Sequence, residues 1–171
     1  MDPAAPESGF TLIELMVVLL IMGILMAIAI PTFLGVTGAA NDRSVQSNLT
    51  NAMIDAKAIF AKRDAYPSTP KMVTALGGSE PVLHFQSGAS TNPADISVKT
   101  GTTTTGATIE LAAWMPDTKT CWLAKDDETA SASTVGAVYD YNVKVTAAEC
   151  TAAVSGTAPW SARYPTPPPG H

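Results

Sequence analysis

One carboxylate and two cysteines are the residues of this 171-residue chain whose type and setting point to chemistry. Glu14 stands immediately before an uncharged apolar run, Leu15–Ile30. A carboxylate at the centre of a bilayer costs roughly 3 kcal/mol, and less near an interface, so a charge in this position is expected to have a function. Cys121 and Cys150 are far apart in the sequence and belong to no CxxC motif. Glu14 therefore has to be explained together with the apolar run.

Patterns that carry enzymatic chemistry are missing from the sequence. It contains no G-x-S-x-G, Walker A or HExxH motif, and its two histidines, His84 and His171, complete no metal-ligand cluster. The formal net charge of −5 argues against a dedicated nucleic-acid-binding protein. The acidic residues 126–128 are expected in a turn, because the spaced ligands and glycine of a Ca²⁺ loop are lacking. We predict that the chain is not an enzyme and takes no cofactor or metal, and that His84 is a surface loop residue.

The apolar segment has the length of a membrane span. A helix from Phe10 to Ile30 would extend roughly 31 Å, close to the hydrocarbon core of a bilayer. One interpretation is a secretory signal cleaved after Ala27-Ile28-Ala29, but residues 1–9 contain two acids and no Lys or Arg. A plain signal anchor accounts for the length of the segment and leaves Glu14 unexplained. A third interpretation comes from a family resemblance.

The string Gly9-Phe10-Thr11-Leu12-Ile13-Glu14-Leu15, followed by an apolar helix, resembles the processing site of the type IV pilin family. That family includes type IV pilins, minor pilins and the pseudopilins of type II secretion. The resemblance implies that prepilin peptidase cuts between Gly9 and Phe10 and then N-methylates Phe10, so that residues 1–9 are a removable leader. Leaders of this family are usually basic, whereas this one is acidic.

Cleavage at Gly9 would explain the position of Glu14. It would create a cation, the α-amine of Phe10, about one helical turn from the Glu14 carboxylate. If subunits stack axially, Glu14 of one subunit can meet the Phe10 amine of its neighbour inside a dry helical bundle, where a mismatch is penalised. We therefore expect Glu14 to set the register of assembly. The alternative is a carboxylate that snorkels to the lipid headgroups.

The apolar segment is expected to continue into one long, bent helix, residues 10–63, whose first part, residues 10–30, is the transmembrane segment and filament core. Four residues are predicted to soften this helix: Gly23, Pro31, Gly35 and Gly38. A proline costs a helix interior about 3 kcal/mol and a glycine about 1 kcal/mol. The second part is amphipathic, and the helix should end before Tyr66-Pro67. Its apolar face comprises Val45, Leu49, Ala52, Met53, Ala56, Ile59 and Phe60.

Residues 64–158 are predicted to form a globular head, and the Pro-rich residues 159–171 a flexible tail. Residues 64–94 are rich in turn formers and are expected to be irregular, with a short helical turn at 71–76. Alternating apolar and polar residues then predict strands near 96–99, 107–115, 120–125 and 137–145. The predicted fold is α+β and pilin-like: a long N-terminal helix packed against a small antiparallel β-meander.

Cys121 and Cys150 are expected to form a disulfide, because the head should lie outside the reducing cytosol. In the chain-entropy model a bridge closing such a loop contributes roughly 3 kcal/mol. Many type IV pilins resemble this arrangement in having a C-terminal disulfide-bounded loop. The alternative is a pair of free buried thiols.

The function implied by the resemblance is that of a structural subunit of a type IV pilus-like filament, serving adhesion, twitching motility or DNA uptake. Its partners would be identical subunits, prepilin peptidase, the inner-membrane assembly machinery and, before assembly, the lipid of the cytoplasmic membrane; the filament would be extracellular. Alternatives are a type II secretion pseudopilin, a minor pilin whose head binds DNA or a surface, and a plain membrane-anchored exported domain. For nucleic-acid binding the candidate residues are Trp160, Arg163 and Tyr164.

Overall fold

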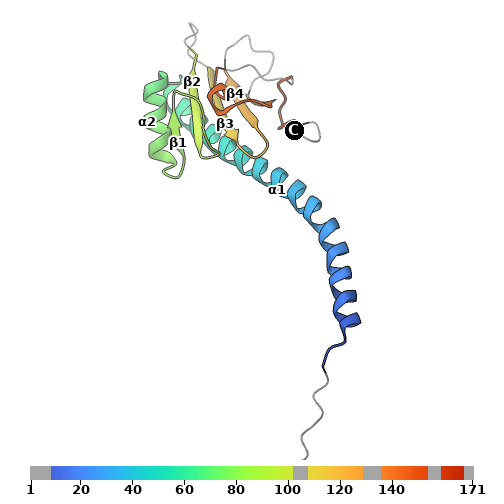
Figure 1. Ribbon diagram of the computed structural model, residues 1–171. Coiled ribbons are helices and arrows are strands. Elements are labelled where there is room, and N and C mark those ends of the chain that lie inside the picture. Colours follow the sequence, from blue (N-terminus) through green and yellow to red (C-terminus); the bar gives the residue numbers. More distant parts are fainter. Residues whose placement is uncertain (1–8, 102–107, 129–135, 154–158, 168–171) are drawn as a thin grey trace, which may run out of the picture. The chain divides into compact units, whose positions relative to one another are not determined.

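The computed structural model describes residues 9–101, 108–128, 136–153 and 159–167, and only the backbone of residues 31–37. The chain divides into two units, Met1–Thr37 and Gly38–His171. A long helix is followed by a second helix and a five-stranded sheet, which confirms the predicted α+β class (Figure 1). The elements are α1 (Leu12–Arg63), α2 (Thr69–Ser79), β1 (His84–Gln86), β2 (Asp95–Thr100), β3 (Thr108–Met115), β4 (Thr120–Asp127), β5 (Gly136–Val143) and the 3₁₀ turn η1 (Ala147–Glu149).

Helix α1 ends at the residue that the sequence predicts and begins at Leu12, two residues later than predicted. It ends at Arg63, where Asp64 adopts a left-handed conformation (φ 56°) and donates its N–H to the Phe60 carbonyl at 2.7 Å. The predicted softening residues Gly23, Pro31, Gly35 and Gly38 all lie within α1 and do not end it. In the second unit the predicted apolar face is buried: Val45, Leu49, Ala52, Met53 and Ala56 contribute to the core, with Ile59 and Phe60 packed against it.

The sheet has the order β1-β2-β3-β4-β5. Strands β2 to β5 form the predicted antiparallel meander. Strand β1, in a segment that was expected to be irregular, pairs with β2 in parallel, so the sheet is mixed. His84 was expected in a loop but begins β1; its side chain is exposed, as expected, and its Nδ1 lies 3.4 Å from the Asp95 carboxylate.

The connection between α1 and the sheet contains a full helix, α2, where only a short turn at 71–76 was expected. Pro70 lies in its first turn, where a missing N–H is tolerated. Met72 and Leu76, one turn apart, are fully buried, and Figure 1 shows α2 beside β1. Burial of this narrow apolar stripe compensates for the low helix propensity of Thr, Gly and Ser in the segment.

Both faces of the sheet are covered. One face packs on the second part of α1 and on α2 and holds the main core, with Trp122 and Leu111 fully buried. A smaller cluster on the other face surrounds the Cys121–Cys150 disulfide, whose Cα atoms are 5.4 Å apart. This is the bond that the sequence favoured, and it holds the segment after β5 against β4.

The C-terminal segment 159–167, which we call the strap, is not the flexible tail that was expected. Ser161 pairs with Tyr139 of β5. The Tyr164 ring packs on Tyr139 and Trp122, with ring centroids 4.1 and 5.7 Å away. Aromatic burial therefore fixes a segment whose composition alone predicts no fixed structure. Residues 1–8 of the predicted leader and 168–171 of the predicted tail lie outside the described residues.

Candidate functional site

The first unit carries an apolar helical surface. Leu12–Ile30 has a mean hydropathy of 2.9 and no buried residue, and by length and composition it is apolar enough to cross a membrane. Its large apolar side chains are between 48% and 75% exposed. A contiguous apolar surface of this size marks a contact with lipid or with other proteins. The surface therefore qualifies as a membrane anchor, as an assembly interface, or as both at different times.

Glu14 closes a capping box at the start of this helix. Its Oε2 accepts the Thr11 N–H at 2.9 Å and the Thr11 hydroxyl at 2.6 Å, and its own N–H is donated to Thr11 Oγ1 at 3.3 Å. These bonds satisfy two of the backbone donors that every helix start leaves without an intrahelical partner. This role was not predicted, although its sequence signal, Thr-x-x-Glu before an apolar run, is present.

Gly9 and Phe10 precede the helix. Both are exposed, and the Phe10 side chain is 89% exposed. The peptide bond between them lies in a non-helical stretch. Phe10 is separated from Glu14 by the single turn that the capping box encloses.

A buried carboxylate marks the point where α1 enters the head. Asp42 accepts a hydrogen bond of 2.8 Å from Thr118 Oγ1 and one of 3.0 Å from Trp122 Nε1. Next to it, Asn41 Nδ2 donates to the Asp117 carboxylate at 2.6 Å. These bonds tie α1 to the β3–β4 turn and to β4. No local pattern predicts the bonds to Asp42, because its partners lie 76 and 80 residues away.

A second polar cluster holds the end of α1. Asp126 and Asp127 were expected in a turn, but both belong to β4, and Asp126 is fully buried. Asp126 accepts hydrogen bonds from the Lys57 amine at 2.8 Å and from the Tyr66 hydroxyl; Lys57 also reaches Glu128 at 3.1 Å. Burial of a carboxylate is tolerated here because both of its oxygens are paired.

This cluster shifts the titration of two of its members. Burial, together with the hydrogen bond to Asp126, raises the pKa of Tyr66 well above its usual value. For Lys57, partial burial lowers the pKa, but the bonds to Asp126 and Glu128 outweigh it, so the pKa is raised. Both groups are therefore held in their protonated forms.

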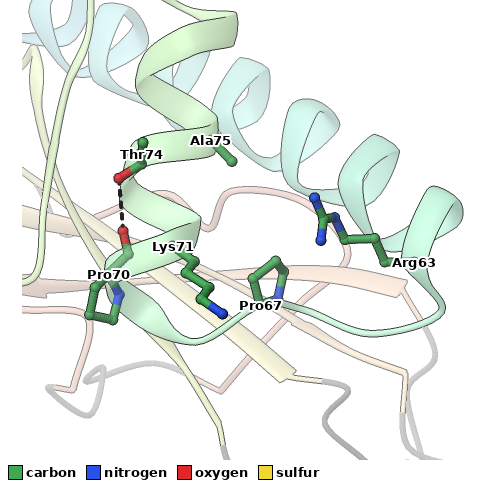
Figure 2. Close-up of a pocket in the computed structure, with 6 residues that line it drawn as sticks. All are labelled: Arg63, Pro67, Pro70, Lys71, Thr74 and Ala75. Carbon is green, nitrogen blue, oxygen red and sulfur yellow. Dashed lines mark hydrogen bonds between the residues drawn. The ribbon is translucent and has the colours of Figure 1, made fainter.

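An open pocket of about 450 Å³ lies between the end of α1 and the start of α2 (Figure 2). Arg63 and Lys71 are the charged residues of its lining. The Thr74 hydroxyl donates a hydrogen bond of 3.1 Å to the Pro70 carbonyl. The other lining residues are Pro67, Pro70 and Ala75. The lining contains no acid and no nucleophile paired with a base, so it forms no catalytic centre. In the described part of the chain no group of acidic, histidine or cysteine side chains is arranged to hold a metal ion.

Comparison with known proteins finds the prokaryotic N-terminal methylation motif at residues 5–30. The chain is 43% identical over 60 residues to the type IV major pilin protein PilA of Myxococcus xanthus, a match that covers 35% of this chain and 27% of that protein. It is 43% identical over 77 residues to type II secretion system core protein G of Pseudomonas aeruginosa, covering 41% and 49%. It is 52% identical over 40 residues to the type IV narrow pilus major component PilA5 of Thermus thermophilus, covering 23% and 34%.

The chain thus spans less than half the length of each of these relatives. No solved structure is a significant match. The relatives are components of pili and of a secretion system rather than enzymes, in agreement with the prediction that this chain is not an enzyme. The methylation motif and these relatives together support the resemblance to the type IV pilin family.

Proposed function

We propose that this chain is a structural subunit of a type IV pilus-like filament. The observation that carries the proposal is the exposed apolar helix Leu12–Ile30 joined to a folded polar head. A helix whose apolar surface is exposed on all sides can bury that surface in lipid, and it can also bury it in a bundle with copies of itself. The same surface can therefore store the subunit in the cytoplasmic membrane and later form the core of an extracellular filament.

Proteolytic processing would convert the subunit stored in the membrane into one that can enter the filament. In this proposal prepilin peptidase cuts between Gly9 and Phe10 and methylates the new amine, and the inner-membrane assembly machinery then extracts the subunit. The exposed, non-helical setting of these residues supports cleavage there. The new amine would lie beside Glu14, whose carboxylate is at present engaged by Thr11. Assembly would bring the Phe10 amine of a neighbouring subunit to Glu14 and so fix the axial register.

A type II secretion pseudopilin is the second candidate. The observation that favours it is the match to core protein G, which covers a larger share of this chain than do the two pilus components. The Cys121–Cys150 disulfide favours a pilin, because many type IV pilins resemble this arrangement in having a C-terminal disulfide-bounded loop. On this ground we place the pilus subunit first.

A minor pilin that binds DNA through its C-terminal segment has less support. Of the three candidate residues, Trp160 and Arg163 are exposed, but the Tyr164 ring is packed between Tyr139 and Trp122. A ring that is engaged in these two aromatic contacts is less available for stacking with a base than an exposed ring is.

The decisive experiment is the mass of the native protein and its location. A pilus subunit should begin at methylated Phe10 and should be abundant in fibres sheared from the cell surface. A methylated Phe10 with the protein confined to the cell envelope would favour the pseudopilin. An uncut Met1, or a start at Ile30, would refute both candidates.

A further inference from the structure

The strap, residues 159–167, occupies an edge of the sheet. At its centre the Tyr139 N–H is donated to the Ser161 carbonyl at 2.8 Å, and the Ser161 N–H is donated to the Tyr139 carbonyl at 3.1 Å. This reciprocal pair of bonds is that of two antiparallel strands. The strap therefore pairs with β5 as a short added strand would, at the middle of β5.

The strap also reaches across to α1. The Tyr164 hydroxyl donates to the Gln46 carbonyl at 3.1 Å, while the Tyr164 ring contacts Tyr139 and Trp122. Burial raises the pKa of Tyr164 above its usual value, so its hydroxyl keeps the proton that it donates. The ring anchors the strap, and the backbone bonds of Ser161 place it on the strand.

A segment that covers the edge of a sheet prevents that edge from pairing with another chain. β5 is the last strand of the sheet, and a strand at an edge presents backbone donors and acceptors that can pair with another chain. We propose that the strap is an edge cover, and that the groups beneath it on β5 become, when the strap is released, a docking edge for β5 of a second copy of this chain.

The sequence of β5 suits a copy of itself. A two-fold axis at Tyr139 would place the two Tyr139 residues opposite each other and Ala137 opposite Tyr141 of the second copy. The Tyr141 N–H, which is donated to Asp140 Oδ1 at 2.7 Å, would exchange that bond for one to the Ala137 carbonyl of the second copy. Asp140 is the single charged residue of β5, and it would face Val138, so no like charges would be directly opposed. The antiparallel polarity required is the one that β5 already accepts from Ser161.

The test uses the full chain in detergent micelles. Tyr164→Ala removes the anchoring ring, and Ser161→Pro independently removes the N–H donated to Tyr139. Arg163→Ala is the matched control, because Arg163 belongs to the strap but is exposed. Hydrogen exchange of the Tyr139 amide and the protein mass by light scattering are followed over a range of protein concentrations. The exchange of Leu123, in the covered centre of the sheet, reports whether each variant is folded.

In the wild type and in Arg163→Ala the Tyr139 amide should exchange slowly at every concentration. In both strap variants it should exchange at least tenfold faster in dilute solution, and at higher concentration protection should return together with the mass of a dimer. Slow exchange in folded strap variants would show that the strap does not cover the edge. Fast exchange with an unchanged mass at every concentration would show that β5 does not accept a second copy. If Tyr164→Ala loses protection at Leu123, Ser161→Pro alone decides between these outcomes.

Discussion

The indole Nε1 of Trp122 donates a hydrogen bond of 3.0 Å to the carboxylate of Asp42, and this bond joins α1 to the centre of the sheet. Trp122 is also in contact with Tyr141 and with Tyr164 of the strap. One fully buried side chain thus connects the entry of α1, the strand β5 and the C-terminal segment. The packing of the second part of α1 within the head depends on a polar contact as well as on apolar packing.

Replacing Asp42 by alanine should destabilise the head. The change removes the acceptor of two buried hydrogen bonds, those from Thr118 and Trp122, and a buried donor left without a partner costs about 1–3 kcal/mol. Thermal unfolding of the full chain in detergent, followed by the near-ultraviolet circular dichroism of tryptophan, measures the loss. Asp117→Ala is the control: it also removes a bond to α1, the one from Asn41, but this bond is exposed and water can replace it, so the loss of stability should be smaller than that of Asp42→Ala. Equal melting of the two variants would contradict the role given to Asp42.

Alkaline pH should weaken the fold from about pH 10 upward. The pKa of Tyr66 is raised from 10.0 and that of Lys57 is raised from 10.5, so the unfolded chain releases these protons at a lower pH than the folded chain does. Above pH 10 the unfolded state therefore binds fewer protons, and the free energy of unfolding falls as the pH rises. Below pH 10 both contributions are fully present.

Urea unfolding at a series of pH values measures this dependence. Tyr66→Phe removes one of the two titrations in the cluster, so its free energy of unfolding should fall less steeply above pH 10. A slope equal to that of the wild type would show that Tyr66 ionises in the folded protein as it does in the unfolded chain.

How far the sequence predicts the structure depends on the range of the interactions. The extent of α1 follows from local signals, namely its apolar periodicity and Pro67 beyond its end. The antiparallel strands follow from alternation along each segment. Asp126 was misplaced because three consecutive acids are typical of a turn; Lys57 and Tyr66, which allow its burial, lie 69 and 60 residues away in the sequence.

The long range of the interactions also accounts for the other differences between the predicted and the observed structure. Helix α2 has weak local propensity and is held by Met72 and Leu76 against the core, so only its central turn was foreseen. The parallel pairing of β1 with β2 involves three residues on each strand, too few to produce a periodic pattern. The strap is held by contacts of Tyr164 with Tyr139 and Trp122, and no local sequence rule predicts these contacts. The capping box at Thr11 is different, because its signal is local and was overlooked.

Loss of the disulfide should cost stability without detaching the C-terminal segment. Replacing both Cys121 and Cys150 by alanine should lower the free energy of unfolding by roughly 3 kcal/mol, the loop-closure contribution expected for a loop of this length. Two backbone contacts would still hold the segment: Ser90 N–H to the Cys150 carbonyl at 2.8 Å and Ala152 N–H to Ser97 Oγ at 2.9 Å. Urea unfolding should show the loss, while amide exchange at Ala152 should remain slow in the native state. Rapid exchange at Ala152 would mean that the bridge alone holds the segment.

Pro31 should weaken α1 locally. A proline donates no backbone N–H, so the bond to the Ala27 carbonyl that another residue would make at this position is lost. Pro31→Ala should strengthen the helix by about 3 kcal/mol and slow the amide exchange of the adjacent turns in micelles. Gly23→Ala is the comparison: nothing lies within 4 Å of the added Cβ, and the gain should be only about 1 kcal/mol. A larger effect at Gly23 than at Pro31 would contradict the predicted order of the softening residues.

The charge of Glu14 and its capping bond can be separated by substitution. Glu14→Gln keeps an oxygen that accepts the Thr11 N–H, because glutamine also serves in a capping box, but it removes the charge. Thr11→Ala removes the cap at a cost of about 0.5–2 kcal/mol and leaves the carboxylate in place. If the charge sets the register, Glu14→Gln and Glu14→Ala should both insert in the membrane and both fail to enter filaments. Thr11→Ala should then still assemble, with a reduced yield. The measurement is the amount of each variant in sheared fibres relative to the amount in the membrane. Normal fibres from Glu14→Gln, with none from Glu14→Ala, would assign the assembly role to the cap and refute the register hypothesis.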